Sequence, residues 1–371
     1  MGSPDSTSAD ASAQVPSLRM IALKAGVSRS TVSEALRPGS TAVAPAVRER
    51  IQRIAAEVGY RKNPLLSELM THMRRNQAHS FRGKLALINA NVDRDALRRH
   101  PTIPTYVAGC ERRAAALGYS FDHFWLHDPT LNAAAWLRIF QTRALKGILI
   151  VGLMDQTSLP THLLALWEKF PTVVTGVRTH QPVLSFCCVD HHALIMSAFE
   201  KALELGYARP ALVLDPAIDE LVEGRISGGM LMAQHRLPER QRLPSFYAMD
   251  AARRNPAVFA RWLDQHKPDV IFTLYNVVFD WLAAADRRVP QDVGVIQLEW
   301  RANRPDVAGM HQHNDVVGEA AVDMLIQKTY RLEAAEEDFP RATMIGATWI
   351  DGASVRPQKA ARKPRSRKIV R

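Results

Sequence analysis

The sequence has few cysteines, no long apolar run and only 7% aromatic residues. Its three cysteines, two of them adjacent as Cys187 and Cys188, fit neither a disulfide framework nor a zinc site. No apolar run reaches the roughly 20 residues of a membrane span, and the first fifteen residues lack a secretory signal pattern. We therefore expect a cytoplasmic protein without a membrane-spanning segment. Its 371 residues, 47% hydrophobic and 23% charged, are enough for two or three globular domains.

Acidic residues are scarce at the two ends of the chain. The net charge is +11: residues 17–80 contribute +7 and residues 356–371 contribute +8, whereas residues 1–16 and residues 81–355 contribute about −2 each. Positive ends favour a polyanionic partner, either nucleic acid or a membrane surface. We expect residues 1–16 to be a disordered tail. Residues 356–371 form a basic disordered tail that either attracts phosphates without sequence preference or only keeps the chain soluble.

Residues Ser17–Leu36 have the pattern of two short helices joined by a tight turn. Gly26 permits the turn, and Ser28 stands where its hydroxyl can cap the second helix. That helix buries one apolar face and exposes small polar and charged groups, as a helix-turn-helix does in a major groove. An ordinary helical hairpin is the alternative for this spacing alone. A third helix follows from Pro45, and the headpiece covers residues 17–62.

Residues 63–80 follow the headpiece and carry a one-sided apolar stripe that includes Leu66 and Leu69. Asn63 can cap a helix whose first position is Pro64. A stripe of this kind is typical of a core or dimer helix. Its place between headpiece and body makes a hinge helix, whose apolar side chains open a minor groove, a more attractive interpretation.

Residues 81–355 alternate between apolar strand patterns and amphipathic helices. The pattern predicts strands such as LALINA at 85–90 and SFYAMD at 245–250, with helices between them. Continuous apolar strands between helices indicate parallel sheets covered on both faces. The series restarts near residue 190, so we expect two similar α/β halves with a ligand in the cleft at the carboxyl ends of their strands.

Together these motifs resemble the LacI/GalR family of bacterial transcription regulators. The match runs from AGVSRSTVSEAL at 25–36 through Glu57–Tyr60 and Arg225–Gly228 to Gln312. The resemblance implies an N-terminal all-α helix-turn-helix headpiece and an α/β two-lobed effector domain with parallel sheets, like a type I periplasmic binding protein. It also implies a homodimer on a pseudopalindromic operator of double-stranded DNA, a small-molecule effector that is a sugar or sugar derivative, and no cofactor.

The resemblance also assigns DNA-contacting residues by position. It implies that Arg29, Ser30 and Glu34 read bases and that hydroxyl groups near them hold phosphates. Glu34 stands where arginine is frequent in the family, so we expect a different base preference, such as a cytosine amino group. The complete predicted set is Leu18, Ser28, Arg29, Ser30, Thr31, Ser33, Glu34, Asn63, Leu66 and Leu69.

The predicted effector site lies in the body. By resemblance, Arg225 grips ligand oxygens with its planar fork of donors. Tyr275 and Asn276 follow one strand, and Glu299 follows another. Trp300 comes directly after the same strand as Glu299 and is a candidate to stack on a sugar ring, whereas we expect Trp125 and Trp281 in the core.

Two groups of residues resemble metal ligands on a quick scan. One contains Cys187, Cys188, Asp190, His191 and His192, and the other contains His311 and His313 on either side of Gln312. Each falls at a crossing between elements, and Asp190 suits a helix cap, so we expect structural roles and no metal.

Four functions are compared. The leading hypothesis is a ligand-responsive, sequence-specific repressor of carbohydrate-utilisation genes. A regulator that senses a nucleobase or another non-sugar metabolite is one alternative, and a transport-type sugar-binding module is another. An enzyme on a similar scaffold is disfavoured because no nucleophile triad, phosphate loop or paired carboxylates can be read in the sequence.

Overall fold

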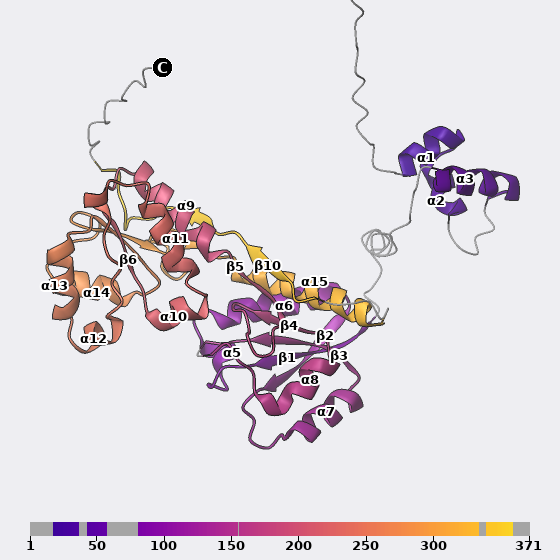
Figure 1. The fold of residues 1–371 in the computed structure, drawn as a ribbon, viewed down its shortest axis with the longest axis horizontal. Coiled ribbons are helices and arrows are strands. Elements are labelled where there is room, and N and C mark those ends of the chain that lie inside the picture. Colours follow the sequence, from indigo (N-terminus) through magenta and orange to yellow (C-terminus); the bar gives the residue numbers. More distant parts are fainter. Residues whose placement is uncertain (1–17, 37–42, 58–80, 155, 334–338, 359–371) are drawn as a thin grey trace, which may run out of the picture. The chain divides into compact units, whose positions relative to one another are not determined.

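The computed structural model describes residues 18–36, 43–57, 81–154, 156–333 and 339–358. The chain divides into two compact units, Met1–Ala78 and His79–Arg371 (Figure 1). We call the first the headpiece and the second the body. The predicted hinge at 63–80 and the predicted tail at 1–16 lie outside the described residues.

The headpiece contains the three predicted helices: α1 (Leu18–Ala25), α2 (Arg29–Ala35) and α3 (Pro45–Glu57). Gly26 joins α1 to α2 with a φ of +62°, a conformation that a residue without a side chain adopts at little cost. The core consists of a few aliphatic side chains from all three helices, namely Ile21, Ala22, Ala25, Val32, Ala35, Ile51 and Ala55. A core of this size is small for a domain that must fold alone.

The first lobe of the body is built on a six-stranded sheet whose paired strands are all parallel, in the order β10-β5-β4-β3-β1-β2. Its strands are β1 (Gly83–Asn89), β2 (Tyr119–Trp125), β3 (Leu145–Val151), β4 (Thr172–Thr175), β5 (Ser185–Val189) and β10 (Ala342–Ile345). The helices of this lobe are α5 (Ala96–Arg99), α6 (Ile103–Ala116), α7 (Ala133–Thr142), η1 (Thr161–Leu163), α8 (Leu164–Lys169) and α15 (Asn314–Glu333).

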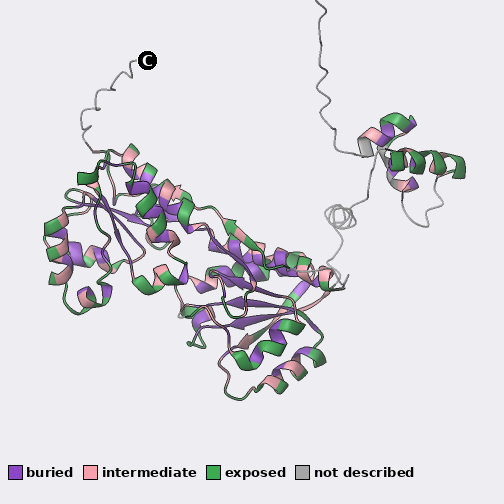
Figure 2. Cartoon of the chain, viewed as in Figure 1, coloured by how far each residue is buried: buried purple, intermediate pink, exposed green. Residues whose placement is uncertain are grey.

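Helices cover both faces of this sheet, as the continuous apolar strands predict. In β1, Leu85 and Leu87 belong to a cluster with residues of α6 and α15, whereas Ala86 and Ile88 belong to a cluster with residues of α7. The strands of the sheet are largely buried and the helices expose their outer faces (Figure 2). The helices α6 and α15 lie close together because Gly109 of α6 faces the backbone of α15, where a side chain would not fit.

The second lobe has a five-stranded sheet in the order β11-β9-β8-β7-β6, with β11 antiparallel to β9. Its strands are β6 (Pro210–Val213), β7 (Val270–Thr273), β8 (Gly294–Gln297), β9 (Gly309–His311) and β11 (Thr348–Ile350). Its helices are α9 (His191–Glu204), α10 (Pro216–Leu221), α11 (Arg225–Gln234), η2 (Glu239–Gln241), α12 (Met249–Arg254), α13 (Ala257–His266) and α14 (Val277–Ala284).

The chain crosses between the lobes at three places: after β5, after β9 and after β10. The crossing segments are hydrogen-bonded to one another. The amide of Asp190 donates to the carbonyl of Ile345 over 2.9 Å, and His313 Nε2 lies 2.8 Å from Thr348 Oγ1. The predicted restart near residue 190 is therefore confirmed as the first crossing.

Two expectations for the second lobe were wrong. SFYAMD is not a strand, because Phe246 forms only an isolated bridge with Val213 and α12 begins at Met249. The ring of Phe246 packs instead against Trp262 and Trp281, so its apolar character reflects a core contact.

The second error concerns the C-terminal boundary of the body, which was expected at residue 355. The amide of Arg356 donates to Tyr207 Oη over 3.1 Å, and the amide of Gln358 donates to the carbonyl of Leu205 over 2.7 Å. These bonds tie the first residues of the predicted tail to the second lobe. Within the described parts of the chain, no helix is both long and apolar enough to cross a membrane.

Candidate DNA interface and effector cavity

The helix α2 begins at a side-chain cap, as predicted. Ser28 has an extended backbone, and its Oγ accepts from the amide of Thr31 over 3.1 Å. The two hydroxyl groups also lie 2.8 Å apart. An N-cap of this kind satisfies one of the amides that a helix start leaves unpaired. The cap therefore fixes where α2 begins and which residues form its first turn.

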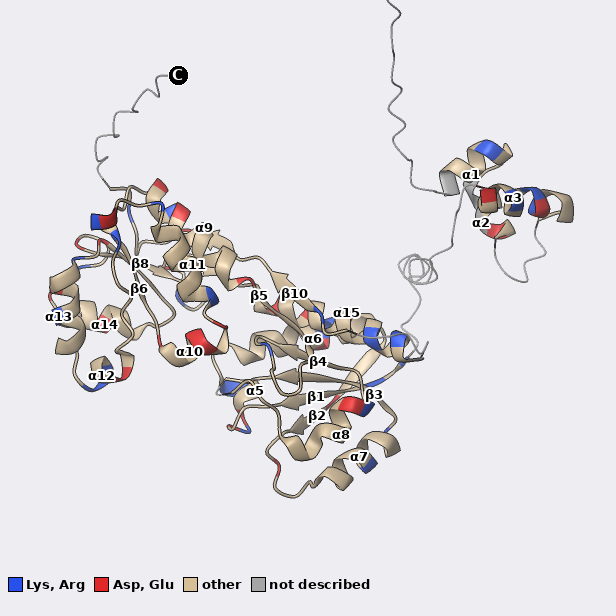
Figure 3. Ribbon diagram, viewed as in Figure 1, with Lys and Arg blue, Asp and Glu red and all other residues tan. Residues whose placement is uncertain are grey.

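One face of α2 is buried and another is accessible. Val32 and Ala35 are 0% and 1% exposed in the headpiece core, whereas Thr31 and Glu34 are partly exposed. On the other two helices the bases Lys24, Arg50 and Arg53 and the acids Glu49 and Glu57 are exposed (Figure 3). A capped helix with an accessible polar face is suited to nucleic acid.

The described residues cover only part of the predicted DNA-binding set. The backbones of Leu18, Arg29, Ser30 and Ser33 lie in helices, but their side chains are outside the described part of the chain. Asn63, Leu66 and Leu69 lie outside the described residues altogether.

A cavity of about 600 Å³ lies between the two lobes of the body. It is bounded by residues that follow the carboxyl ends of strands in both sheets, which is where ligands bind in open α/β folds. From the first lobe it is lined by His100, Pro101, Thr102, Tyr106, Gly152, Leu153, Met154, Thr175, Gly176 and Val177. From the second lobe it is lined by His191, Ile218, Leu221, Val222, Ile226, Arg253, Leu274, Tyr275, Asn276, Val277, Glu299 and Arg301, with Gln312 at a crossing.

Three of the predicted effector residues meet in this cavity: Tyr275, Asn276 and Glu299. Burial raises the pKa of Tyr275 to about 12, and its hydroxyl accepts from the amide of Asp215 over 3.3 Å. Asn276 is exposed at the start of α14. Tyr275 is thus neutral at physiological pH and presents a ring with a bonded hydroxyl.

Arg225 lies one layer behind the cavity wall rather than in it. Its Nε donates to the carbonyl of Val222 over 2.7 Å, and its Nη1 donates to Cys188 Sγ over 3.0 Å. Its Nη2 is buried with no hydrogen-bond partner. Val222 and His191, which lie next to the guanidinium, both line the cavity. The charge is therefore close to the cavity but is separated from it by this wall.

Trp300 is not brought into the cavity. Its ring packs 5.5 Å from that of His311, and its amide donates to the carbonyl of Met310. Trp281 lies in the core of the second lobe, as predicted. Trp125 is only partly buried; its Nε1 donates to the carbonyl of Asn91 over 2.9 Å.

A polar contact across the cleft was not predicted from the sequence; we call it the interlobe clasp and define it as Thr102, Glu299 and Arg301. The hydroxyl of Thr102 in the first lobe donates to Glu299 Oε1 over 2.7 Å, and Arg301 Nη2 lies 2.8 Å from Glu299 Oε2. Arg301 also donates to Thr102 Oγ1 over 3.3 Å. Thr102 and Glu299 are far apart in the sequence, so no local pattern could have paired them.

An ion pair lies across the cleft as well. Glu223, between α10 and α11, approaches Arg178 to 3.5 Å and His180 to 3.7 Å, both from the segment after β4. Glu223 has a φ of +59°, which is uncommon for a residue with a side chain and costs backbone energy. Together with the interlobe clasp, this pair holds the lobes in their present arrangement.

The residues that resembled metal ligands have structural partners. Asp190 caps α9, its Oδ1 accepting from the amide of Ala193 over 2.9 Å. Burial, together with the charge of Arg225, lowers the pKa of His191 to about 3, so His191 is neutral. His311 Nδ1 accepts from the amide of His313 over 3.1 Å.

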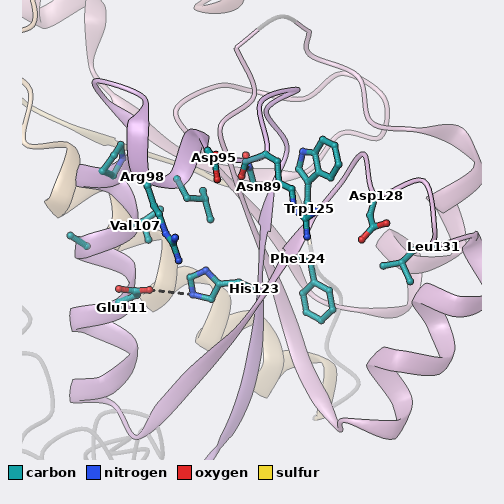
Figure 4. A pocket seen from close by; sticks show the side chains of 14 residues that line it. Asn89, Asp95, Arg98, Val107, Glu111, His123, Phe124, Trp125, Asp128 and Leu131 are labelled. Carbon is teal, nitrogen blue, oxygen red and sulfur yellow. Dashed lines mark hydrogen bonds and ion pairs between the residues drawn. The ribbon is translucent and has the colours of Figure 1, made fainter.

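A second cavity, of about 740 Å³, lies entirely within the first lobe, between β2, α5 and α6 (Figure 4). His123 and Glu111 both line it and point toward each other, with 3.2 Å between Nε2 and Oε1. The guanidinium of Arg94 lies 5.7 Å from the ring of Trp125. This cavity touches one lobe only, so a ligand there would not contact the second lobe.

The fold and the two sites define a class of protein: a DNA-binding regulator that couples a helix-turn-helix headpiece to a two-lobed sensing domain. A family model for bacterial regulatory proteins of the lacI family matches residues 17–63. The ribose operon repressor of Escherichia coli strain K12 is 24% identical over 331 residues, covering 84% of this chain and 92% of that protein. The HTH-type transcriptional regulator CelR of Thermobifida fusca is 24% identical over 332 residues, with the same coverage.

Solved structures share the fold over nearly the whole chain. A transcriptional regulator CelR–cellobiose complex has a TM-score of 0.54 at 20% identity, covering 92% of this chain and 100% of that one. The lac repressor dimer bound to operator and the anti-inducer ONPF has a TM-score of 0.54 at 17% identity, with the same coverage. Residues 17–63 thus match the lacI family model, and the chain as a whole is similar in sequence and fold to transcriptional regulators of that family.

Proposed function

We propose that this protein is a repressor that binds a pseudopalindromic operator as a homodimer and responds to a small molecule in the interlobe cavity. The observation that carries the proposal is that one chain joins a capped, accessible α2 to a cavity walled by two lobes. A ligand shared by two lobes can change their arrangement, and only a ligand that prefers one arrangement shifts the equilibrium between them.

On the DNA side, α2 enters the major groove with its first turn toward the bases. Arg29, Ser30 and Glu34 read base edges, whereas Ser28, Thr31 and Ser33 hold the register through phosphates. Leu66 and Leu69 of the hinge enter the minor groove and bend the operator. Leu18 and Asn63 support these contacts at the two ends of the interface.

On the effector side, the contacts across the cleft provide the coupling. The hydrogen bond from Thr102 to Glu299 and the ion pair of Glu223 with Arg178 form only when the lobes adopt the present arrangement. An effector that contacts both walls adds to these bonds or competes with them. The resulting movement of the first lobe changes the spacing of the two hinges in the dimer, and with it the affinity for the operator.

The chemical class of the effector is a separate question. The names of two relatives mention ribose and cellobiose, which supports the predicted sugar and the regulation of carbohydrate-utilisation genes. The alternative of a non-sugar metabolite is favoured by a specific observation, the aliphatic side chains of the cavity wall. A transport-type binding module is disfavoured by the headpiece.

The test is a DNA-binding titration of the full-length protein against duplexes from the region around its own gene. We expect a preference of at least about a thousandfold over bulk DNA for one pseudopalindromic site. Affinity should fall steeply with added salt, because each phosphate contact releases a counterion. Equal binding to every duplex, or a flat salt profile, would refute the proposal.

Two matched variants test whether Glu34 contacts a base and whether Lys24 contributes only sequence-independent attraction to DNA. Glu34→Gln should change the preferred base at one operator position and leave the salt slope nearly unchanged, because Glu34 is proposed to contact a base. Lys24 is exposed on α1, and Lys24→Gln should lower the affinity for DNA of every sequence by the same factor. Identical effects of the two changes would argue against the assigned role of Glu34.

A further inference from the structure

Two histidines lie where the chain crosses from the second lobe to the first lobe after β9. His311 is the last residue of β9, and His313 directly precedes α15. The centroids of their rings are 4.2 Å apart, and both side chains are partly exposed. Gln312 between them lines the interlobe cavity. Two titratable rings are therefore in contact beside this cavity, in a segment that joins the two lobes.

His313 connects two of the three crossings. Its ring Nε2 lies 2.8 Å from Oγ1 of Thr348, the first residue of β11, and its amide donates to His311 Nδ1 over 3.1 Å. The φ of His313 is +52°, which is uncommon for a residue with a side chain and costs backbone energy. The next residue extends the connection, because Asn314 Nδ2 donates to Glu299 Oε1 of the interlobe clasp over 3.4 Å. These bonds hold the crossing in its present conformation.

The bond between the two histidines requires a neutral His311. Its Nδ1 accepts from an amide only when it carries no proton, so the proton of the neutral ring is on Nε2. Protonation makes both ring nitrogens donors, and the Nδ1 proton then faces the amide proton of His313. The acceptor is lost, and a positive charge is placed against the ring of His313. The uncommon backbone conformation of His313 then loses one of the two bonds that hold it.

The groups around the two rings come from several elements. From α15 comes the carboxylate of Asp315, which pairs with Arg112 of α6 over 2.9 Å. The segment after β8 contributes the ring of Trp300, 5.5 Å from that of His311, between the paired Glu299 and Arg301 of the interlobe clasp. The strand β8 contributes the neutral Gln297, and β11 contributes the neutral Thr348. Helix α9, which packs on β9 and β11, places Lys201 over the ring of Trp349.

This environment keeps His311 neutral at physiological pH. Burial and the neighbouring His313 lower the pKa of His311, whereas Asp315 acts in the opposite direction. The ordinary pKa of a histidine is about 6.5, so protonation of His311 takes place below that pH. The bond from the amide of His313 is thus present at neutral pH and is lost on acidification.

We propose that His311 and His313 form an acid-sensitive switch of the lobe arrangement. Protonation of His311 breaks its bond with the amide of His313, the crossing after β9 relaxes, and its connections to Thr348 and to the interlobe clasp weaken. The lobes then leave their present arrangement. The switch is a property of the body alone. Its consequence, an affinity for the operator that depends on pH, rests on the proposed function.

Energy transfer between dyes on the two lobes tests the switch in the full-length protein, without DNA or effector. The dyes are attached through Thr161→Cys in η1 and Arg261→Cys in α13, two exposed positions, and the three native cysteines are buried. Excess unlabelled protein ensures that the signal reports a distance within one chain.

We expect one reversible step in transfer efficiency on acidification from about pH 8 to about pH 5, with its midpoint below about pH 6.5. Helix content, followed by circular dichroism, should stay constant through the step. A constant transfer efficiency over this range, or a step that coincides with loss of helix, would overturn the proposal.

The variant His311→Gln identifies the group that titrates. The glutamine amide has an oxygen that can accept from the amide of His313, but it takes up no proton in this range. The variant should therefore keep the transfer efficiency of neutral pH and lose the step. His162→Gln, at an exposed histidine of η1, is the control and should keep the step. A step that persists in His311→Gln would refute the assignment.

The variant His313→Asn gives a second test that does not depend on the folding of the first variant. Asparagine tolerates the left-handed backbone, and the substitution removes the ring that lowers the pKa of His311. The midpoint of the step should therefore move to higher pH. An unchanged midpoint would contradict the coupling of the two rings.

A histidine at the cleft offers a comparison of opposite sign. His180 lies 3.7 Å from Glu223 across the cleft, so its protonation adds attraction between the lobes. His180→Gln removes this attraction and should keep the step. Loss of the step in His180→Gln together with its retention in His311→Gln would place the acid response at the cleft and overturn the proposal.

The outcome for the switch is separable from that for the operator. Operator preference together with no step in transfer efficiency would reject the switch and leave the proposed repressor standing. A step that His311→Gln removes, in a protein without any operator preference, would support the switch and reject the repressor.

Discussion

The headpiece and the body differ in how much core supports their functional residues. The headpiece has one small cluster of aliphatic side chains from three short helices, whereas the body has three larger clusters around two sheets. A small core cannot compensate for a buried polar group, so the headpiece carries its polar residues on an accessible face. The body can hold the buried His191 and the partly buried Arg225 and Glu299 beside its cavity. A change at a functional residue should therefore affect stability less in the headpiece, where these residues are accessible, than in the body, where they are partly or fully buried.

The largest effect is expected from truncation of the headpiece core. Ile51→Ala truncates a side chain that is 0% exposed. The free energy of unfolding of the headpiece should fall by about 2–5 kcal/mol, which is enough to unfold so small a unit. Specific DNA binding should be lost while the thermal transition of the body stays in place, as calorimetry and DNA titration would show. Gln52→Ala, at an exposed position of the same helix, is the control. A matching shift of the transition of the body would contradict the division into two units.

A pH dependence should distinguish the body from the headpiece. The pKa of His191 is lowered to about 3 in the folded protein. On acidification His191 therefore becomes protonated near pH 6.5 in the unfolded chain but stays neutral in the folded protein until about pH 3. The free energy of unfolding of the body should fall between pH 6.5 and 3, by on the order of 3 kcal/mol from this group.

His191→Gln should flatten that pH profile relative to the native chain, and the difference between the two profiles isolates this group from the carboxylates. The described headpiece residues contain no histidine, so its transition should not share this dependence. Equal pH profiles for the native protein and the variant would show that His191 is not excluded from water.

The interlobe clasp gives a smaller effect within the body. Thr102→Val keeps the shape of the side chain but removes the hydroxyl that donates to Glu299. The free energy of unfolding of the body should fall by about 2 kcal/mol, because hydrogen bonds to charged groups contribute stability in that range. Small-angle scattering should detect a more open body. Thr161→Val, at an exposed threonine in η1, is the control. An unchanged melting temperature and radius would mean that the clasp contributes nothing to lobe closure.

The smallest effect is expected at the cap of α2. Ser28→Ala removes the side-chain acceptor for the amide of Thr31 and should destabilise the headpiece by about 1 kcal/mol. Specific DNA affinity should fall modestly, as fluorescence anisotropy would measure. Ser28→Asp retains the acceptor and should restore headpiece stability, so a loss equal to that of alanine would argue against the cap.

Much of the fold was predictable because its signals are local. Gly26, Ser28 and Pro45 predicted the turn, the cap and the third helix of the headpiece, and each is found where expected. The alternation of strands and helices predicted two parallel sheets. The family resemblance, by position, implied that Tyr275, Asn276 and Glu299 are effector residues, and all three line the interlobe cavity at the carboxyl ends of strands.

The errors arose where one local pattern fits two environments. SFYAMD reads as a strand, yet Phe246 is apolar because it fills an aromatic cluster. Trp300 also follows a strand end but turns toward His311 and away from the cavity. Position along a strand predicts which end of a sheet a residue occupies, but not the direction its side chain takes once neighbours compete for the space.

The sequence by itself determined most of the helices and strands, their order and the resemblance to the LacI/GalR family, because helix caps, turn residues and hydrophobic periodicity act over a few neighbouring residues. Only the tertiary structure decided how the cavity is completed. It brought Thr102 of one lobe onto Glu299 of the other, placed the guanidinium of Arg225 behind Val222, and lined the cleft with aliphatic side chains. Those contacts join residues far apart in the chain, and their geometry follows from the packing of two lobes through three crossings.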